Sequence, residues 1–487
     1  MISRRTFAAF LLLGLLIRLA GLALPGTPDT MVWKIWSYNG ARLGATRLYG
    51  VGGNPPERRL LEYGGEATTV DYPPLSLYEF SAAGHIIRAL RPTFPNDAIL
   101  GASLKLLPVL AEVGLAILLL RVGSRGAALA YWLNPAAILN ASYLGYTDSL
   151  FVLPAVAALV AADVGWLEVA GGLFGAALLT KVQAILIGPV FLLILLPGFG
   201  RLVRFAAGMV YVAIAAIAPF VFAGAAPNML QALASLTHHD MLSGYAANVW
   251  WIVTYLIRAS YAVGDLGAWA AFTMPVRILA ITRTLEIGLP NPRPFAMMLV
   301  LITFIWAVRK AKVGRTLSGR AADSPATATP ARMSGPPDVC QLSAVGAFLV
   351  HAYFVLAVQV HENHLFMAIP LLALAASGRP AFRPILIAVS AIAALNFNLF
   401  YGIDGRGWLA LPRGITIVDA SVVLSAANAV ALIWHARVLS AGMPSRATPR
   451  SGSSLAGASP SDPPRTLPSD PPLVRVDPRY TDARCPA

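Results

Sequence analysis

Charged residues are scarce in this chain. Only 12% of its 487 residues are Asp, Glu, Lys or Arg, while 57% are apolar; average proteins carry about 25% charged residues. Cysteine is nearly absent too, and two cysteines cannot form a disulfide framework. This composition excludes an ordinary globular protein and a disordered chain, and it predicts a polytopic membrane protein.

Nucleotide-binding motifs are missing as well. The sequence has no P-loop, and no G-x-G-x-x-G enters a helix after a strand. A net charge of +14 is high enough to suggest a nucleic-acid partner. Arg and Lys lie mostly in short loops and tails beside apolar runs, however, so membrane topology and lipid headgroups explain the charge better. We expect no nucleic acid among the partners.

Long apolar runs are abundant. A helix of about 20 apolar residues crosses the hydrocarbon layer, and such runs recur from Phe7 to Trp434. A cleaved signal peptide was weighed for the first run, but Arg18 interrupts it and no clear cleavage site follows. We expect an all-α fold of about 12 to 14 transmembrane helices. The expected spans are 7–24, 97–120, 127–145, 149–163, 166–180, 184–199, 205–224, 294–309, 340–360, 365–378, 384–401 and 415–435.

The arginine-rich loops indicate the orientation. If the N-terminus is cytoplasmic, these loops fall inside, as the positive-inside rule requires. Segment 75–90 carries Glu79, His85 and Arg88, so we interpret it as an amphipathic helix in the outer interface. Segment 247–283 fits either a membrane hairpin or two surface helices.

We predict one transmembrane domain over residues 1–439, with a first outer loop over 25–96. Segments 310–338 and 440–487 are rich in Pro, Ser, Ala and Arg and have no apolar face. We predict that both are disordered and cytoplasmic.

Unusual polar residues gather on the outer side in this topology. Charged groups near hydrocarbon are costly unless they face water or each other, so their convergence on one face predicts a site. They are Asp29, Asp71, Tyr72, Tyr146, Asp148, Lys181, Gln183, His238, His239, Asp240, His361, Glu362, His364, Asp404 and Arg406.

Each of these residues also has a plain structural explanation. Asp29 and Asp148 fit helix N-caps, and Lys181 fits a lysine that reaches toward headgroups. The "HENH" of residues 361–364 fits a solvated loop. It does not match the zinc pattern H-E-x-x-H, because Leu365 stands where the second histidine is needed, so no metal site is predicted.

Several motifs occur in an order that resembles a known family. The chain resembles GT-C glycosyltransferases over about residues 7–435, especially the endoplasmic-reticulum glucosyltransferases that extend lipid-linked oligosaccharides, and their bacterial relatives. The motifs are "PDTMVWKIW", "VDYPPLSLY", "NPAAILNASYLGYTDSLF", "LLTKVQAIL", "YAANVWW" and "VQVHENHLFMAIP". "DYPPL" and "QVHENH" are the most specific of these.

The resemblance implies a polyprenyl-phosphate-linked sugar donor and a non-cytoplasmic acceptor. The acceptor class stays open among a glycolipid, a lipid-linked glycan and a protein. The resemblance also implies a bacterial inner-membrane location and an acidic general base in the first outer loop, where Asp29 stands. The family usually has a second acidic residue two positions later. Met31 stands there instead, which leaves any metal role of that carboxylate in doubt.

Glycosyl transfer needs chemistry that the outer face offers. Asp29 is the candidate base, and Lys181, His361, His364 and Arg406 are candidates to bind the donor phosphate. We assign orienting or substrate-binding roles to Glu362, Asp148, Tyr72, Gln183 and Asp71. Trp250 and Trp251 fit either a stacking wall or interfacial anchors. No cofactor is required for certain, and nothing in the sequence indicates a divalent cation.

A transporter or lipid flippase is the alternative. It predicts polar residues along a path across the membrane, for which Arg18, Lys105 and Glu112 are the few candidates. Related enzymes that move a mannosyl, arabinosyl or other unit fit the same motifs as a glucosyltransferase.

Overall fold

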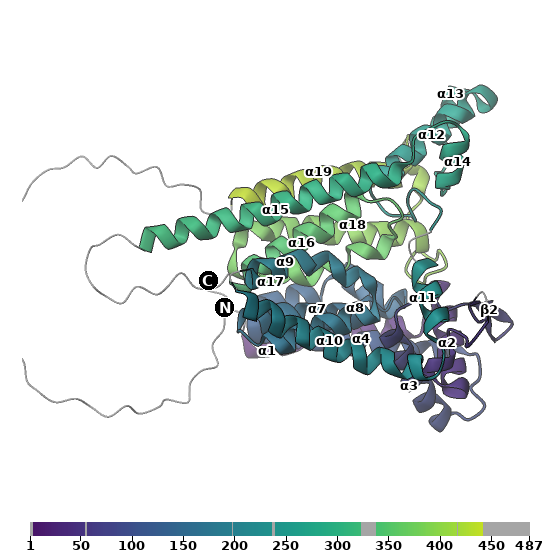
Figure 1. Ribbon diagram of the computed structural model, residues 1–487. Helices are drawn as coiled ribbons and strands as arrows, with labels where there is room; N and C mark the ends of the chain where they lie inside the picture. The colour runs from purple at the N-terminus through teal and green to yellow at the C-terminus, as the bar shows by residue number, and fades with distance from the viewer. Residues whose placement is uncertain are drawn as a thin grey trace, which may run out of the picture.

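The computed structural model describes residues 3–53, 56–196, 198–235, 239–322, 338–415 and 417–441, nearly all of them in a helical bundle (Figure 1). Seven described helices are long and apolar enough to cross a membrane, which confirms the predicted all-α polytopic fold. They are α1 (Arg4–Leu22), α4 (Ala98–Val122), α10 (Phe199–Phe222), the first part of α15 (Pro292–Ala322), α16 (Val339–Leu356), η5 (Pro380–Phe382) with α18 (Arg383–Tyr401), and α19 (Ala420–Ala441).

Shorter helices occupy the other expected positions. They are α5 (Arg125–Trp132), α6 (Pro135–Ile138), η2 (Leu139–Tyr143), α7 (Asp148–Asp163), α8 (Leu167–Thr180), η3 (Val182–Ile187), α9 (Gly188–Leu195), η4 (Glu362–Leu365) and α17 (Ala368–Gly378). The expected span 127–145 is broken, because the Asn134 side chain caps a new helix at Pro135.

Two predicted boundaries were wrong. The expected span at 205 begins six residues earlier, at Phe199, directly after an extended Gly198. The expected span at 415 begins at Ala420 instead, because Asp419 accepts hydrogen bonds from Ser421 just before the helix.

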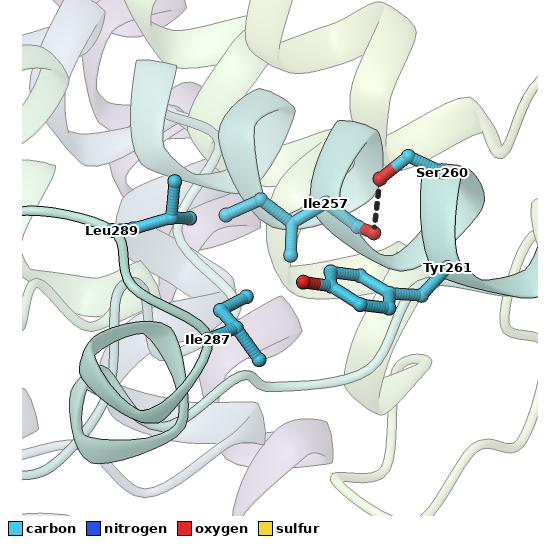
Figure 2. Close-up of a pocket in the computed structure, with 5 residues that line it drawn as sticks. All are labelled: Ile257, Ser260, Tyr261, Ile287 and Leu289. Atoms are coloured by element: carbon cyan, nitrogen blue, oxygen red, sulfur yellow. Dashed lines mark hydrogen bonds between the residues drawn. The ribbon is translucent and has the colours of Figure 1, made fainter.

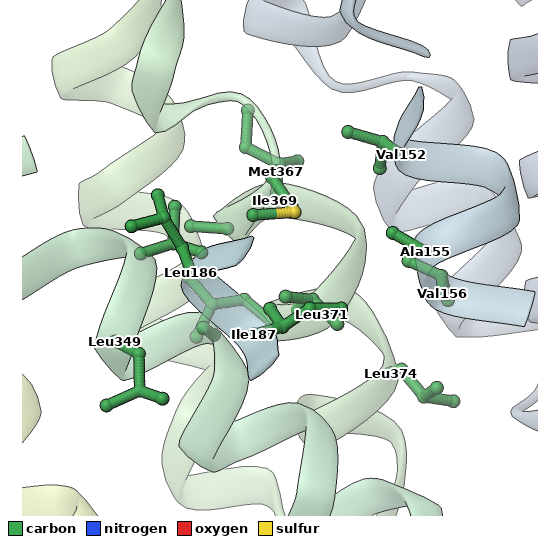
Figure 3. Close-up of a cluster of buried hydrophobic side chains, with 14 of the residues drawn as sticks. Val152, Ala155, Val156, Leu186, Ile187, Leu349, Met367, Ile369, Leu371 and Leu374 are labelled. Carbon is green, nitrogen blue, oxygen red and sulfur yellow. The ribbon is translucent and has the colours of Figure 1, made fainter. Parts of the chain in front are cut away.

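Helix α16 forms the centre of the bundle. Nearly all of its side chains are buried, including Leu349. Figure 3 shows this leucine in a cluster with Ile187 of η3, Leu371 of α17 and Val156 of α7. Helices α1, α10 and α15 instead expose apolar side chains such as Leu12, which suits helices that face lipid.

A layer of shorter elements covers one end of the bundle, opposite the start of α1 (Figure 1). It contains α2 (Asp29–Leu43), η1 (Ala45–Arg47), a hairpin of β1 (Leu61–Tyr63) and β2 (Glu66–Thr68), α3 (Pro74–Leu90) and α11 (Ala226–Ser235). Helix α3 confirms the helix expected at 75–90, and it packs closely on α2. A Cβ at Gly84 would lie 2.0 Å from the Ser37 carbonyl oxygen.

A helical arm extends from the same end of the bundle (Figure 1). It comprises α12 (Val249–Leu266), α13 (Ala268–Thr273) and α14 (Ile281–Glu286). The membrane-hairpin alternative for 247–283 was wrong, because α13 has six residues and cannot cross a bilayer.

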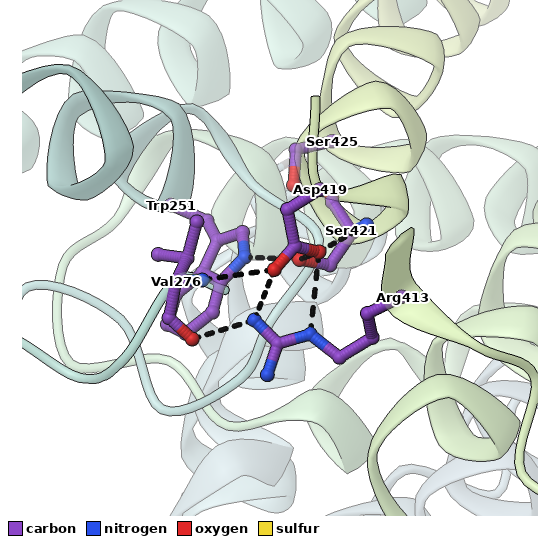
Figure 4. A network of polar contacts seen from close by, with 6 residues as sticks. All are labelled: Trp251, Val276, Arg413, Asp419, Ser421 and Ser425. Carbon is purple, nitrogen blue, oxygen red and sulfur yellow. Dashed lines mark hydrogen bonds and ion pairs between the residues drawn. The ribbon is translucent and has the colours of Figure 1, made fainter. Parts of the chain in front are cut away.

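Polar contacts fix the base of this arm. Asp419 pairs with Arg413 of η6 (Arg413–Ile415) and accepts from the Val276 amide (Figure 4). In the same network, Trp251 Nε1 donates to Ser421 Oγ at 2.8 Å.

The two tryptophans of this region pack inside the protein. Trp251 is fully buried, and the Trp250 indole donates to the Leu356 carbonyl at 2.7 Å. Neither tryptophan is an interfacial anchor, because both are packed against the bundle.

A hollow of about 310 Å³ lies between α12 and the chain that follows α14 (Figure 2). Its lining comprises Ile257, Ser260, Tyr261, Ile287 and Leu289. None of the residues predicted for the site lines this hollow.

Two predicted disordered segments fall largely outside the described residues. Helix α15 continues to Ala322 and so covers the start of segment 310–338. Residues 323–337 and 442–487 lie outside the described part of the chain, as does His238.

Candidate functional site

Four chain segments bring the predicted polar residues to one end of the bundle. Asp29 begins α2, Asp148 begins α7, Lys181 follows α8, and the segment 361–364 follows α16. Direct contacts join the last three. The positions come from separate parts of the sequence, so the tertiary fold assembles this group.

An ion pair between Lys181 and Asp148 lies at the centre. Lys181 Nζ is 2.5 Å from Asp148 Oδ1, and both side chains are buried. Asp148 Oδ2 accepts from Asn140 Nδ2 and Asn363 Nδ2, each at 3.0 Å. The N-cap of α7 is Thr147, without a side-chain capping bond. Asp148 is therefore no helix cap, and its carboxylate orients the lysine and two amides.

Lys181 is likewise no surface lysine. Its side chain is 7% exposed, and Nζ lies 5.6 Å from the centre of the Tyr72 ring and 5.8 Å from that of Phe151. Because the cation is fixed inside the protein between a carboxylate and two aromatic faces, it is placed to attract an anion that enters the site.

The two histidines of 361–364 cap each other. They flank the short helix η4, and the His364 backbone N–H donates to the His361 side chain while the His361 N–H donates to His364 Nδ1 at 3.4 Å. In His364 the proton therefore lies on Nε2. The His361 ring accepts through one nitrogen, so its other nitrogen carries the proton and is the one able to donate. The local backbone thus fixes the tautomer of His364 and leaves His361 one N–H donor.

His364 makes a second contact through its other ring nitrogen. Its Nε2 lies 3.1 Å from the terminal amide of Gln183. Because Nε2 carries the proton, the Gln183 carbonyl oxygen is the matching acceptor, which leaves the Gln183 amide NH₂ free to donate. Gln183 therefore extends the row of donors that starts at Lys181.

Burial keeps these imidazoles neutral. Burial first, and then the nearby His239 and Lys181 charges, together lower the pKa of His361 to about 4. Burial and then the His361 charge hold the pKa of His364 well below its usual range. The cationic state is disfavoured, so both histidines are neutral near pH 7.

Glu362 is buried beneath the histidines. One carboxyl oxygen forms a short hydrogen bond with the Tyr146 hydroxyl. The other oxygen is buried and has no hydrogen-bond partner among the described residues. Burial raises the pKa of Glu362 to about 7, although the bond from Tyr146 opposes the rise. Glu362 forms no hydrogen bond to either imidazole in the described contacts.

Asp29 differs from the other acidic residues of the site. Its side chain is half-buried, and its carboxylate has no hydrogen bond within the described ranges of the chain. The N-cap of α2 is Pro28, so the helix-cap explanation for Asp29 was wrong. Burial raises the pKa of Asp29 to about 6, while the Lys181 charge lowers it. An unpaired carboxylate with this pKa is suited to accept a proton at neutral pH.

Tyr72 and Asp71 join the site from the first outer loop. The Tyr72 ring lies edge-on to Trp33 and Trp36, each at 5.4 Å between centroids, and it faces Lys181. Asp71 is half-buried, and burial raises its pKa, which the His239 charge partly offsets.

His239 also lies beside the site. Its ring centroid is 5.6 Å from that of His361 in an edge-on contact. His239 is half-buried and therefore packs against a residue of the candidate site.

Arg406 is not brought into this group. Its side chain is exposed on the turn that follows α18. Burial and, to a lesser degree, the Arg406 charge lower the pKa of Lys34. No described contact links Arg406 to Lys181 or the histidines, so a phosphate-binding role for Arg406 stays a prediction.

Sequence reasoning missed three polar residues. Asn140 and Asn363 bind Asp148, and Thr180 Oγ1 donates to Glu79 at 3.0 Å. The second Glu79 oxygen is buried without a described partner, and burial raises the Glu79 pKa to about 7. Asn363 lies inside the quoted "HENH", which was the available signal. Glu79 was assigned only to the polar face of an amphipathic helix.

The charged residues inside the bundle contact one another or the backbone. Arg18 Nε lies 2.6 Å from Glu112 Oε2, and both side chains are fully buried. Lys105 Nζ donates to three backbone carbonyls, including that of Leu24 at 2.6 Å. These contacts are typical of structural pairs rather than of a transport path.

No metal centre is present in the part of the chain that the structure describes. No group of three or more His, Cys, Asp or Glu side chains there could hold a metal ion.

Comparisons with known proteins give a structural likeness but no sequence match. No protein-family model matches the chain, and no curated protein matches it in sequence. Among solved structures, the chain is similar to ArnT from Cupriavidus metallidurans in the apo state. The two are 14% identical, the match covers 89% of this chain and 76% of that chain, and the TM-score is 0.36. A likeness of this extent identifies no activity, so the function is argued from the site.

Proposed function

We propose that this protein is a membrane glycosyltransferase of the GT-C type. It moves a hexosyl unit, glucosyl or mannosyl, from a polyprenyl-phosphate sugar to an acceptor hydroxyl on the non-cytoplasmic face. One observation carries the proposal: an unpaired carboxylate, Asp29, lies within the electrostatic reach of a fixed cation, Lys181, beside two neutral imidazole donors.

The reaction is a single displacement. Asp29 takes the proton of the acceptor hydroxyl while the oxygen attacks the anomeric carbon. The bond from that carbon to the phosphate oxygen breaks, and the electron pair leaves with the lipid phosphate. One base and one displacement give inversion at the anomeric carbon.

Negative charge grows on the departing phosphate. Lys181 supplies a full positive charge, His361 supplies a ring N–H, and His364 holds Gln183 so that the Gln183 NH₂ donates toward the phosphate. Donors that are oriented in advance stabilise such charge without reorganisation during the reaction. Arg406 serves, if at all, from the exposed rim, because its side chain makes no contact with this group.

The remaining residues orient these groups or bind the substrates. Asp148 positions Lys181, and Gln183 positions His364. The free oxygen of Glu362 accepts a sugar hydroxyl, Tyr72 supplies an apolar face, and half-buried Asp71 binds near the acceptor.

Met31 supplies no oxygen two positions after Asp29. It packs instead among the apolar residues of α2 and the hairpin. We therefore assign the base role to Asp29 without a partner carboxylate at that position.

The location follows from the topology. The site lies at the end of the bundle opposite the start of α1, which the arginine loops assign to the cytoplasm. We propose a bacterial inner membrane, a polyprenyl chain that runs between lipid-facing helices, and a glycolipid, lipid-linked glycan or protein as acceptor.

A transporter or flippase is the weaker alternative. It needs polar groups open to a path across the membrane, whereas Arg18 pairs with Glu112 in the bundle interior and Lys105 donates to backbone carbonyls.

A donor panel tests the proposal. Protein in nanodiscs is incubated with radiolabelled polyprenyl-phosphate sugars, and label bound to protein and label passed to extracted glycolipids are counted. Saturable binding and transfer of one sugar supports the proposal and chooses the donor. If no sugar of the panel binds, the result favours the transporter alternative.

A further inference from the structure

The turn of residues 402–410, between α18 and η6, touches the loop that carries Asp29. The Gly26 amide donates to the Asp404 carbonyl at 2.9 Å. Gly405 follows with a φ of +82°, and a Cβ there would lie 2.2 Å from the Gly26 carbonyl carbon and 2.4 Å from the Thr27 nitrogen. Only glycine permits this approach of two backbones.

A second loop holds the same segment from another direction. The Thr27 amide donates to the Leu144 carbonyl at 2.9 Å, and the Trp33 indole donates to the Gly145 carbonyl at 3.0 Å. Gly26 has a φ of +79°, and its added Cβ would lie 2.9 Å from the Leu144 carbonyl oxygen. Residues 26–29 are thus held between two loops from distant parts of the sequence.

The turn is also connected to the phosphate side of the site. The Gly407 amide donates to the Tyr401 carbonyl at 2.8 Å. The Tyr401 ring lies 6.4 Å from that of Tyr146, and Tyr146 bonds to Glu362. A continuous set of contacts therefore runs from Glu362 through the turn to Gly26.

Asp29 depends on its backbone for its position. Its carboxylate has no hydrogen bond from another described side chain, so nothing else fixes where it points. A misplacement of about 1 Å between reacting groups costs on the order of 10²-fold in rate.

We propose that Gly405 is a positioning residue, and that the 402–410 turn sets the distance between the Asp29 carboxylate and the phosphate-binding group. This inference rests on the proposed function. Gly405 touches no substrate in it, and acts only through the backbone of residues 26–29.

Two glycines of the same turn provide a matched pair. Gly405→Ala places a methyl group against the Gly26 backbone, whereas Gly407 also has a positive φ, +98°, but nothing within 4 Å of an added Cβ. Both substitutions strain the turn, and only the first separates it from the Asp29 loop. We expect Gly405→Ala to lower kcat by about 10- to 100-fold with donor Kd unchanged, and Gly407→Ala to keep both values.

A milder variant covers the case in which Gly405→Ala does not fold. Asp404 Oδ1 accepts from the Arg406 and Trp408 amides at 2.8 and 2.9 Å, and these bonds shape the turn. Asp404→Ala loosens the turn without added bulk and lowers kcat, while Asp404→Asn keeps the acceptor oxygen and restores the rate.

Hydrogen exchange at the Gly26 amide reports the contact without any activity. Faster exchange in Gly405→Ala, with normal exchange in Gly407→Ala and a lower kcat at unchanged donor Kd, supports the inference. Wild-type turnover in Gly405→Ala, or an equal loss in Gly407→Ala, overturns it. If the wild type transfers no sugar, the proposed function fails. Whether or not sugar is transferred, unchanged hydrogen exchange at the Gly26 amide in Gly405→Ala overturns the proposed contact.

Discussion

Lys181 Nζ lies 2.5 Å from Asp148 Oδ1, and both side chains are buried. The bond joins the residue after α8 to the first residue of α7. It holds the site's cation in place while Asp148 Oδ2 holds Asn140 and Asn363. Removal of either charge leaves the other charge buried and unpaired.

Asp148→Ala is therefore expected to destabilise the protein more than the double variant Asp148→Ala, Lys181→Met. An unpaired buried charge costs about 3–5 kcal/mol, whereas removal of both charges costs less. Thermal unfolding in detergent measures both variants. If the double variant unfolds at the same temperature as the single one, the pair is not coupled in the way we describe.

Asp29→Asn should lower the transfer rate by at least about 10²-fold with little change in expression or donor binding, because it removes the base but hardly any volume. Transfer of radiolabel and donor binding are measured on the same preparation. Asp265, which lies on the distant arm, supplies the matched control as Asp265→Asn. Wild-type turnover in Asp29→Asn would remove Asp29 from the mechanism.

The transfer rate should rise with pH around pH 6 and then level off. Asp29 has a pKa of about 6, so its carboxylate form is populated above that pH. The Lys181 charge lowers this pKa, so Lys181→Met should move the rise to higher pH as well as slow the reaction. The kcat of both proteins is measured from pH 5 to 9. A rise that stays in place in Lys181→Met contradicts the coupling.

His361→Ala and His364→Ala should each weaken use of the donor by about 10-fold or more, since the first removes an N–H donor and the second removes the partner that orients the Gln183 amide. His361→Gln retains an N–H group and is expected to lose less. The exposed His85 supplies a control as His85→Ala. Donor KM and kcat are measured for all four variants. If the kinetics of both alanine variants at 361 and 364 are unchanged, "HENH" has only a structural role.

Glu112→Gln should lower the unfolding temperature and leave the transfer rate per folded molecule unchanged. The Arg18–Glu112 pair is fully buried within the bundle, and no described hydrogen bond or ion pair joins it to the predicted site residues. Loss of transfer in correctly folded Glu112→Gln protein would instead connect the interior charges with function, as the transporter alternative requires.

Composition and apolar runs were enough to predict the fold class. Apolar runs of the length of a bilayer allow little besides helices, because backbone groups in lipid must bond within the chain. The arginine loops predict the orientation, and "HENH" and Asp29 marked two parts of one polar end of the bundle. Boundaries at Phe199 and Ala420 were misplaced, because capping and pairing outside the apolar pattern set them.

Only the tertiary structure decided what each polar residue does. In the sequence, Asp148 fits a helix cap as well as a binding residue. The fold decides between the two because it places Lys181 against the Asp148 carboxylate. Burial and mutual capping make the two histidines neutral. The fold leaves Arg406 exposed and outside the group. The physical reason is that hydrogen bonds and pKa values depend on neighbours within a few ångströms, and these neighbours lie up to hundreds of residues apart in the chain.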